Sequence, residues 1–161
     1  MEAVMNIFIL DDCPVKAAEL QCDKHVVKMI LETGQMLSTI QRRYGSTADG
    51  LYRATHANHP CTVWARESAS NYRWLVAHFK ALSDEYTFRY GKIHATWTKL
   101  KDLVLDIPYG MCDIGLTPFA QAMPDEFRQS DAVQAYRAYY RSNKAAIAVW
   151  TKRDKPDWME I

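Results

Sequence analysis

The feature that most constrains the fold is a long stretch, from Pro14 to about Arg42, in which apolar side chains recur every three or four residues. This period places them on one face of an α-helix. Asp11, Asp12 and Pro14 form a typical helix start, because Asp can cap a helix and Pro is tolerated in the first turn. We therefore predict a long helix here, with a break near Gln21–Cys22. The residues of its buried face are Cys22, Val26, Met29, Ile30, Thr33, Leu37 and Ile40.

Three further segments show the same helical spacing. One follows Pro60 and ends near Tyr90–Gly91, where glycine suits a C-terminal cap. A shorter helix is predicted around His94–Leu105, and a last one from about Ser130 to Val149. The predicted buried residues of the first and last of these helices are Trp64, Tyr72, Leu75, Phe79, Leu82, Tyr86, Val133, Tyr136, Tyr140, Ile147 and Trp150.

The remaining segments carry few strand signals. Glycine and proline mark 43–59 and 108–124 as irregular connections, and the short apolar run Asn6–Leu10 is predicted as a short strand or an extended lead-in. We therefore expect an all-α protein in which 1–161 form one compact domain of three to five helices. Residues 1–4 are interpreted as an extension before a second start at Met5, and 150–161 as a basic-aromatic tail.

Charge and composition exclude several classes of protein. The chain has 20 Lys and Arg against 19 Asp and Glu, so its net charge of +1 gives no global attraction to nucleic acid or acidic membranes. No apolar run approaches the ~20 residues of a membrane helix, and MEAVMNIFILDD lacks the features of a secretory signal. The four cysteines form no C-x-x-C pair. We therefore expect no zinc site, and reduced, mostly buried thiols in a cytoplasmic protein.

A second set of residues on the first helix, the polar stripe, lies beside its apolar face. His25, Lys28 and Glu32 of this set occupy consecutive turns, so an imidazole, an amine and a carboxylate could perform acid–base chemistry or hold a phosphate. The alternative is a solvated face with one Lys28–Glu32 pair, which periodicity alone favours. The polar stripe consists of Gln21, His25, Lys28, Glu32, Gln35 and Thr39.

Two other segments are candidates for nucleic-acid binding. The helix start at 58–66 contains His59 and Arg66, and helix N-termini bind phosphate well; the alternative is simply a capped helix. Residues 134–156 contain six Lys or Arg and one Asp, a local charge of +5, interleaved with aromatic rings. Such a segment can contact phosphates and stack on bases. The alternative is that its tyrosines are core residues and its cations are only solvated.

Several of these segments resemble one known family. The run ELQCDKHVVKMILETGQML resembles the catalytic helix of the phage endonuclease V-type pyrimidine dimer DNA glycosylases, which has a Glu-Leu-x-Asp-x-His run followed by a catalytic Glu seven residues after the His. Glu32 follows His25 at the same interval, and the run itself has one extra residue here. NHPCTVWARESASNYRWL, MPDEFRQSD and YRAYYRSNK resemble further segments of the family in the same order. Leu31 and Gln35 stand where the phage enzyme has arginines.

The resemblance implies a compact all-α fold with long crossing helices, and an N-glycosylase with abasic-site lyase activity that needs no metal or cofactor. Its partner would be duplex DNA containing a damaged or modified pyrimidine, and we expect a monomer. The implied catalytic residues are Glu32 as the catalytic carboxylate, with His25 and Lys28 orienting the sugar or holding phosphate. The implied nucleic-acid-binding residues are His59, Arg66, Arg141, Lys144, Lys152, Tyr139 and Tyr140.

In that family the N-terminal amine attacks the sugar C1′ and forms an imine. Here the nucleophile could be the amine of Met5, that of Met1, or Lys28. Two other functions stay open at this point. One is a nucleic-acid-binding module on the same fold without catalysis. The other is an enzyme acting on free nucleosides or nucleotides, or in viral base modification, which the low net charge favours because duplex affinity depends on phosphate neutralisation.

Overall fold

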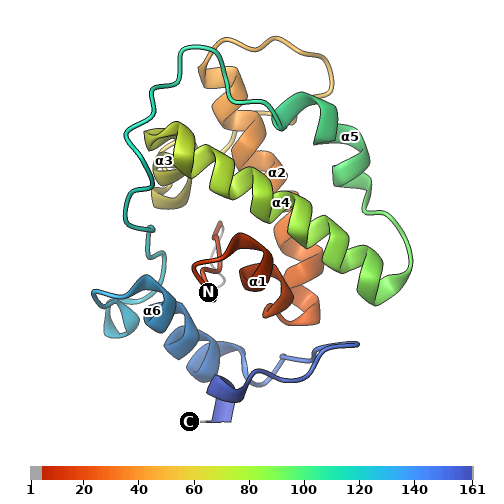
Figure 1. Ribbon diagram of the computed structural model, residues 1–161, viewed down its shortest axis with the longest axis vertical. Helices are drawn as coiled ribbons and strands as arrows, with labels where there is room; N and C mark the ends of the chain where they lie inside the picture. Colours follow the sequence, from red (N-terminus) through yellow and green to blue (C-terminus); the bar gives the residue numbers. More distant parts are fainter. Residues whose placement is uncertain (1–4, 161) are drawn as a thin grey trace.

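The computed structural model describes residues 5–160, and within them every regular element is helical, as predicted. Figure 1 shows the two long helices, α2 and α4, crossing near their middles. α1 packs against α4, and α6 lies at one end of the molecule. Short 3₁₀ or π turns occur at Asp125–Phe127, Tyr140–Lys144 and Asp157–Glu160. The α-helices are α1 Pro14–Glu19, α2 Asp23–Arg43, α3 Pro60–Glu67, α4 Ala69–Tyr90, α5 Ala95–Val104 and α6 Ala132–Tyr139.

The break predicted near Gln21–Cys22 is confirmed. Cys22 has an extended backbone, with φ −68° and ψ 162°, and α2 begins at the next residue. The C-terminal segment supplies the partners that the broken helix lacks, because the Trp150 indole donates to the Leu20 carbonyl at 2.8 Å and the Cys22 amide donates to the Tyr140 hydroxyl at 3.1 Å. A helix end needs such partners for its unpaired backbone groups.

The prediction of one helix from Pro60 to Tyr90 is wrong. Ser68 is extended, with φ −155° and ψ 146°, and divides the segment into α3 and α4. Its hydroxyl donates to Asp113 at 2.9 Å and accepts from the Ile114 amide at 3.1 Å, while Asp113 also accepts from the Ser70 amide at the start of α4. The break is therefore stabilised by a loop about forty residues away in sequence. It helps to bring the number of α-helices within residues 5–160 to six.

The last predicted helix is also shorter than expected. α6 ends at Tyr139, a π turn follows at Tyr140–Lys144, and the chain then turns away. Ile147 is consequently exposed, although Trp150 is buried as predicted. Arg137 on α6 binds the Leu10 carbonyl at 2.9 Å, so this end of the chain is attached to the lead-in segment rather than extended as a helix.

The core lies between α2, α4 and α5, with the lead-in segment against it. Residues 6–10 are buried but form no strand. The helical residues predicted to be buried are buried, except that Tyr86 is half-buried and Ile147 is exposed. α5 approaches α2 closely at Gly34, where a Cβ atom would come within 2.8 Å of Leu100 and Thr96. The α5 helix runs from Ala95 to Val104 as predicted, with His94 as its cap.

Other sequence-based expectations have mixed outcomes. Apart from Arg43, which ends α2, the segments 43–59 and 108–124 are irregular as predicted. Of the thiols, Cys22 and Cys61 are buried, but Cys13 and Cys112 are exposed. The proposed extension at 1–4 lies outside the described residues. None of the described helices is both long enough and apolar enough to cross a membrane.

Candidate active site

Glu32 is the centre of the candidate site. It lies on α2 with 5% of its surface exposed. One carboxylate oxygen, Oε1, accepts a hydrogen bond from the Asn6 backbone nitrogen at 3.1 Å, and the other, Oε2, lies 3.7 Å from Lys28 Nζ. Lys28 itself is half-exposed. A buried carboxylate between a main-chain nitrogen and a lysine amine is placed to accept and return protons.

Asn6 is held in place from several parts of the chain. Its side-chain nitrogen donates to the Ala122 carbonyl at 2.9 Å, and its side-chain oxygen accepts from the Tyr136 hydroxyl at 2.7 Å. The Cys61 thiol also lies 3.8 Å from that oxygen. These contacts come from α3, α6 and the loop before α6, so they fix the lead-in segment beside Glu32. No local sequence signal marks Asn6, because these three partners are 55 to 130 residues away and Glu32 is 26 residues away.

His25 lies about one helical turn before Lys28, on the same face of α2, and is buried. Its ring stacks on Phe8 with a centroid distance of 4.2 Å, and its Nδ1 lies 2.6 Å from the Tyr140 hydroxyl. Burial raises the pKa of Tyr140 well above its usual value, so its ring remains a neutral phenol. The lead-in segment and the π turn after α6 therefore fix the orientation of the imidazole.

The interpretation of the polar stripe as a solvated face is wrong. Gln21, His25, Glu32 and Thr39 are all buried, and only Lys28 and Gln35 are half-exposed. The stripe is covered by the lead-in segment and by the loop at 52–57, where the Thr55 amide donates to the Thr39 hydroxyl at 3.1 Å. Gln21 contacts the buried His78 at 3.2 Å. Helical periodicity identified the shared face but not the segments that cover it.

His59 and Arg66, predicted at a helix start, lie at opposite ends of α3, and both are partly used within the protein. His59 caps the helix, with its Nδ1 accepting from the Cys61 amide at 3.1 Å. Burial, assisted by His56, lowers the pKa of His59, so its ring is neutral at pH 7. Arg66 donates to the Ala57 carbonyl, and burial together with nearby Arg43 lowers its pKa.

The predicted residues of the C-terminal segment are not gathered at Glu32. Tyr139 and Tyr140 are buried, so their rings are core residues in this structure, and Tyr140 reaches the site only through His25. Arg141 donates to the Trp158 carbonyl at 3.1 Å, and Lys144 lies 5.2 Å from the centre of the Tyr139 ring. Lys152 contacts Phe88 near the end of α4.

Within residues 5–160, no group of three or more His, Cys, Asp or Glu side chains is arranged to hold a metal ion. Along this face of α2 lie an imidazole, an amine and a carboxylate, from His25, Lys28 and Glu32. Such groups are suited to proton transfer and to nucleophilic attack by nitrogen.

Comparison with known protein families gave a match. A family model described as pyrimidine dimer DNA glycosylase matches residues 5–99, a range that contains the lead-in segment, all of α2 to α4 and the cluster around Glu32. Neither the curated proteins nor the solved structures that were compared gave a match. The matched range is more than half of the chain, and the chain therefore belongs to the pyrimidine dimer DNA glycosylase family, enzymes that act on DNA.

Proposed function

We propose that this DNA glycosylase removes a damaged or modified pyrimidine from duplex DNA and then cleaves the strand at the resulting abasic site, with Glu32 as the catalytic carboxylate. The observation that supports the proposal is the hydrogen bond of 3.1 Å between the Asn6 backbone nitrogen and Glu32 Oε1. It places the beginning of the lead-in segment against the carboxylate. An amine at this position would be within reach of a proton acceptor.

The proposed reaction starts with attack by a neutral amine on the sugar C1′. The nitrogen lone pair forms the new bond, while the base leaves with the electrons of the glycosidic bond and takes up a proton. Glu32 accepts the proton that the attacking nitrogen loses, and opening of the sugar ring yields an imine. Removal of a proton from C2′ then expels the 3′ phosphate with the electrons of its C–O bond, and water hydrolyses the imine.

Two amines could serve as the nucleophile. A chain beginning at Asn6 would carry its α-amine on the nitrogen that bonds Glu32, and a chain beginning at Met5 would carry it one residue away. Lys28 is the second candidate, because its Nζ lies 3.7 Å from Glu32 Oε2. We favour the lead-in amine, because an adjacent carboxylate stabilises the protonated form of lysine, whose usual pKa is already ~10.4.

Asn6 and Tyr140 position other groups in this proposal. Asn6 holds the lead-in segment beside Glu32. Tyr140 orients His25, which lies on the same face of α2 as Lys28 and would contact the sugar or a phosphate. Among the remaining predicted contacts, Arg66, Arg141 and Lys144 would bind the DNA backbone. We leave the Tyr140 ring out of the DNA-binding surface because it is fully buried.

Borohydride trapping tests the proposal. Chains starting at Met1, Met5 and Asn6 are incubated with dimer-containing and abasic duplexes, and peptide mass spectrometry locates any reduced adduct. We expect an adduct on the N-terminal residue of at least one chain, and loss of strand cleavage in Glu32→Gln. Lys28→Gln should retain the adduct.

An adduct on Lys28 would overturn the assignment of the nucleophile, and full cleavage by Glu32→Gln would overturn the role of Glu32. DNA binding without adduct or cleavage would favour the non-catalytic module. Cleavage of a free nucleoside instead would contradict the proposal that the substrate is duplex DNA.

A further inference from the structure

A hollow of about 290 Å³ lies at the C-terminal end of α2, where α3 and the loop before it pack against the helix. Its size is at the small end of ligand pockets. Apolar or small side chains form one wall, and three arginines form much of the rest. The lining residues are Thr39, Ile40, Arg42, Arg43, Ala54, Ala57, Thr62 and Arg66.

The hollow has a concentrated positive charge. No acidic residue lines it. Among the described residues, no carboxylate lies within salt-bridge distance of any of these three arginines. Arg42 and Arg66 donate only to main-chain carbonyls of the adjacent loop, and Arg43 is exposed at the rim. An anion would offset the repulsion between Arg43 and Arg66, which adds to the burial of Arg66 in lowering its pKa.

The second observation is an unsatisfied hydroxyl in the same wall. Thr62 has no exposed surface, and its Oγ1 has no hydrogen-bond partner. Leaving a buried hydroxyl unpaired is costly, about 1–3 kcal/mol, and such groups are rare in folded proteins. A hydroxyl can donate to an anion oxygen, as Ser and Thr side chains do to DNA phosphates.

We infer that this hollow is a binding site for a backbone phosphate of the DNA, contacted by Arg43, Arg66 and Thr62. The inference rests on the proposed function, since it places the phosphate on the same duplex that Glu32 acts upon. Eleven residues of α2 separate Glu32 from Arg43, a distance of about 16 Å at the helical rise of ~1.5 Å per residue. One strand advances ~3.4 Å per nucleotide, so the phosphate lies within about five nucleotides of the reacting sugar.

The phosphate site also provides a local positive charge for binding DNA, which the net charge of +1 does not provide globally. Leu31 and Gln35 provide no cation beside Glu32, and the Lys28 amine there lies against the carboxylate itself. Further contacts with the backbone must therefore come from elsewhere. Arginine is well suited to this role because its planar guanidinium can bind phosphate through two hydrogen bonds.

Binding measurements on a duplex that cannot react test the site independently of catalysis. The duplex carries a tetrahydrofuran abasic analogue, which cannot form an imine, and its backbone phosphates are replaced one at a time by neutral methylphosphonates over five positions on each side. We compare the unmodified protein with Arg43→Gln, Thr62→Val and, as a control of equal charge change to Arg43→Gln, Lys80→Gln on α4.

In the unmodified protein, one methylphosphonate position should weaken binding by about tenfold, as expected for loss of a charged hydrogen bond. The same position should weaken binding less in Arg43→Gln, because that variant has already lost one of the contacts to this phosphate. The slope of log K against log salt should fall by about 0.9 in Arg43→Gln for the one lost phosphate contact. Thr62→Val should weaken binding without changing that slope, and Lys80→Gln should behave as the unmodified protein.

The inference is overturned if Arg43→Gln and Thr62→Val bind as the unmodified protein does, or if their losses are equal at every methylphosphonate position. In that case cleavage and trapping by the unmodified protein would still support the proposed function. Coupling at one phosphate without any cleavage or adduct would support the phosphate site and contradict the catalytic proposal.

Discussion

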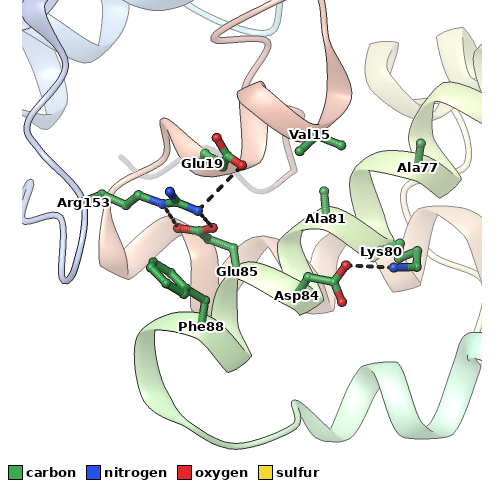
Figure 2. Close-up of a pocket in the computed structure, with 9 residues that line it drawn as sticks. All are labelled: Val15, Glu19, Ala77, Lys80, Ala81, Asp84, Glu85, Phe88 and Arg153. Atoms are coloured by element: carbon green, nitrogen blue, oxygen red, sulfur yellow. Dashed lines mark hydrogen bonds and ion pairs between the residues drawn. The ribbon is translucent and has the colours of Figure 1, made fainter.

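Two hollows on this protein contain arginine in opposite circumstances. The groove between α1 and α4, of about 410 Å³, is lined by Arg153 together with three carboxylates (Figure 2). Arg153 binds both oxygens of Glu85 at 2.9 and 3.0 Å and approaches Glu19 at 3.6 Å. In the hollow beside α3, which we infer to bind phosphate, Arg43 and Arg66 face no carboxylate among the lining residues.

The pKa values of Arg153 and Arg66 shift in opposite directions. The hydrogen bonds that Arg153 donates to Glu85 raise the pKa of Arg153, whereas burial and the neighbouring Arg43 lower that of Arg66. The comparison teaches that the number of arginines in a segment does not indicate where DNA binds. An arginine already paired with a carboxylate contributes to folding, and one without such a partner remains available for an anion.

The largest expected effect on stability comes from neutralising Glu85, which lines the groove between α1 and α4. Glu85 is buried and contacts both Arg153 and the fully buried side chain of Arg89. Glu85→Gln leaves these cations without their main counter-charge, so we expect the free energy of unfolding to fall by about 3–5 kcal/mol. Urea denaturation measures this. Asp84→Asn breaks the exposed pair with Lys80 and should cost less than about 1 kcal/mol. Equal losses of stability in Glu85→Gln and Asp84→Asn would contradict the expected difference between the buried and the exposed ion pairs.

The next effect is a pH dependence located between the same two helices. Burial lowers the pKa of His78 to about 4, against about 6.5 in an unfolded chain. Between these values the unfolded chain binds a proton that the folded protein does not. Stability should therefore fall as the pH drops from 6.5 to 4, by up to about 1.4 kcal/mol per pH unit.

His78→Gln isolates this contribution. Glutamine can keep the contacts with Gln21 and the Pro14 carbonyl but does not titrate. Denaturation curves across this pH range should show a shallower decline for His78→Gln, with the contributions of other groups cancelling in the difference. Parallel curves for the two proteins would contradict the assignment.

The smallest expected effect is a difference in stability between variants of Arg153 and Arg43. Arg153→Ala should lower the stability by about 1 kcal/mol, because Arg153 is one-third exposed and its pairs are partly screened. Arg43→Ala should leave the stability unchanged within about 0.5 kcal/mol, as for a surface residue without partners. Thermal unfolding of both variants measures the difference. A larger loss in Arg43→Ala would show that Arg43 supports the fold instead of being available to a ligand.

Much of the fold could be predicted from the sequence because helical periodicity is local. The apolar face of α2, the break before Asp23 and the Gly91 cap of α4 were all predicted, and Gly91 has the left-handed backbone expected of such a cap, with φ 73°. The break at Ser68 and the early end of α6 were not predicted. Each depends on hydrogen bonds to distant segments, such as that between Ser68 and Asp113.

The candidate site divides in the same way. The spacing of His25, Lys28 and Glu32 placed them on one face of a helix, and the resemblance of that run assigned the carboxylate its role. Asn6, Thr62 and Arg43 carry no such pattern. Their importance follows from what they meet: Asn6 from its bond to Glu32, and Thr62 and Arg43 from the hollow that they share.

By itself, then, the sequence determined the helical class, most helix ends and the face that carries Glu32, since these depend on neighbours within about one turn. Only the tertiary structure decided that the polar stripe is covered, that Tyr140 supports His25, and which cations are already paired. The physical reason is that burial and charge pairing arise between residues far apart in the chain. Glu85 binds Arg153, 68 residues away, and Asn6 reaches Glu32 across 26.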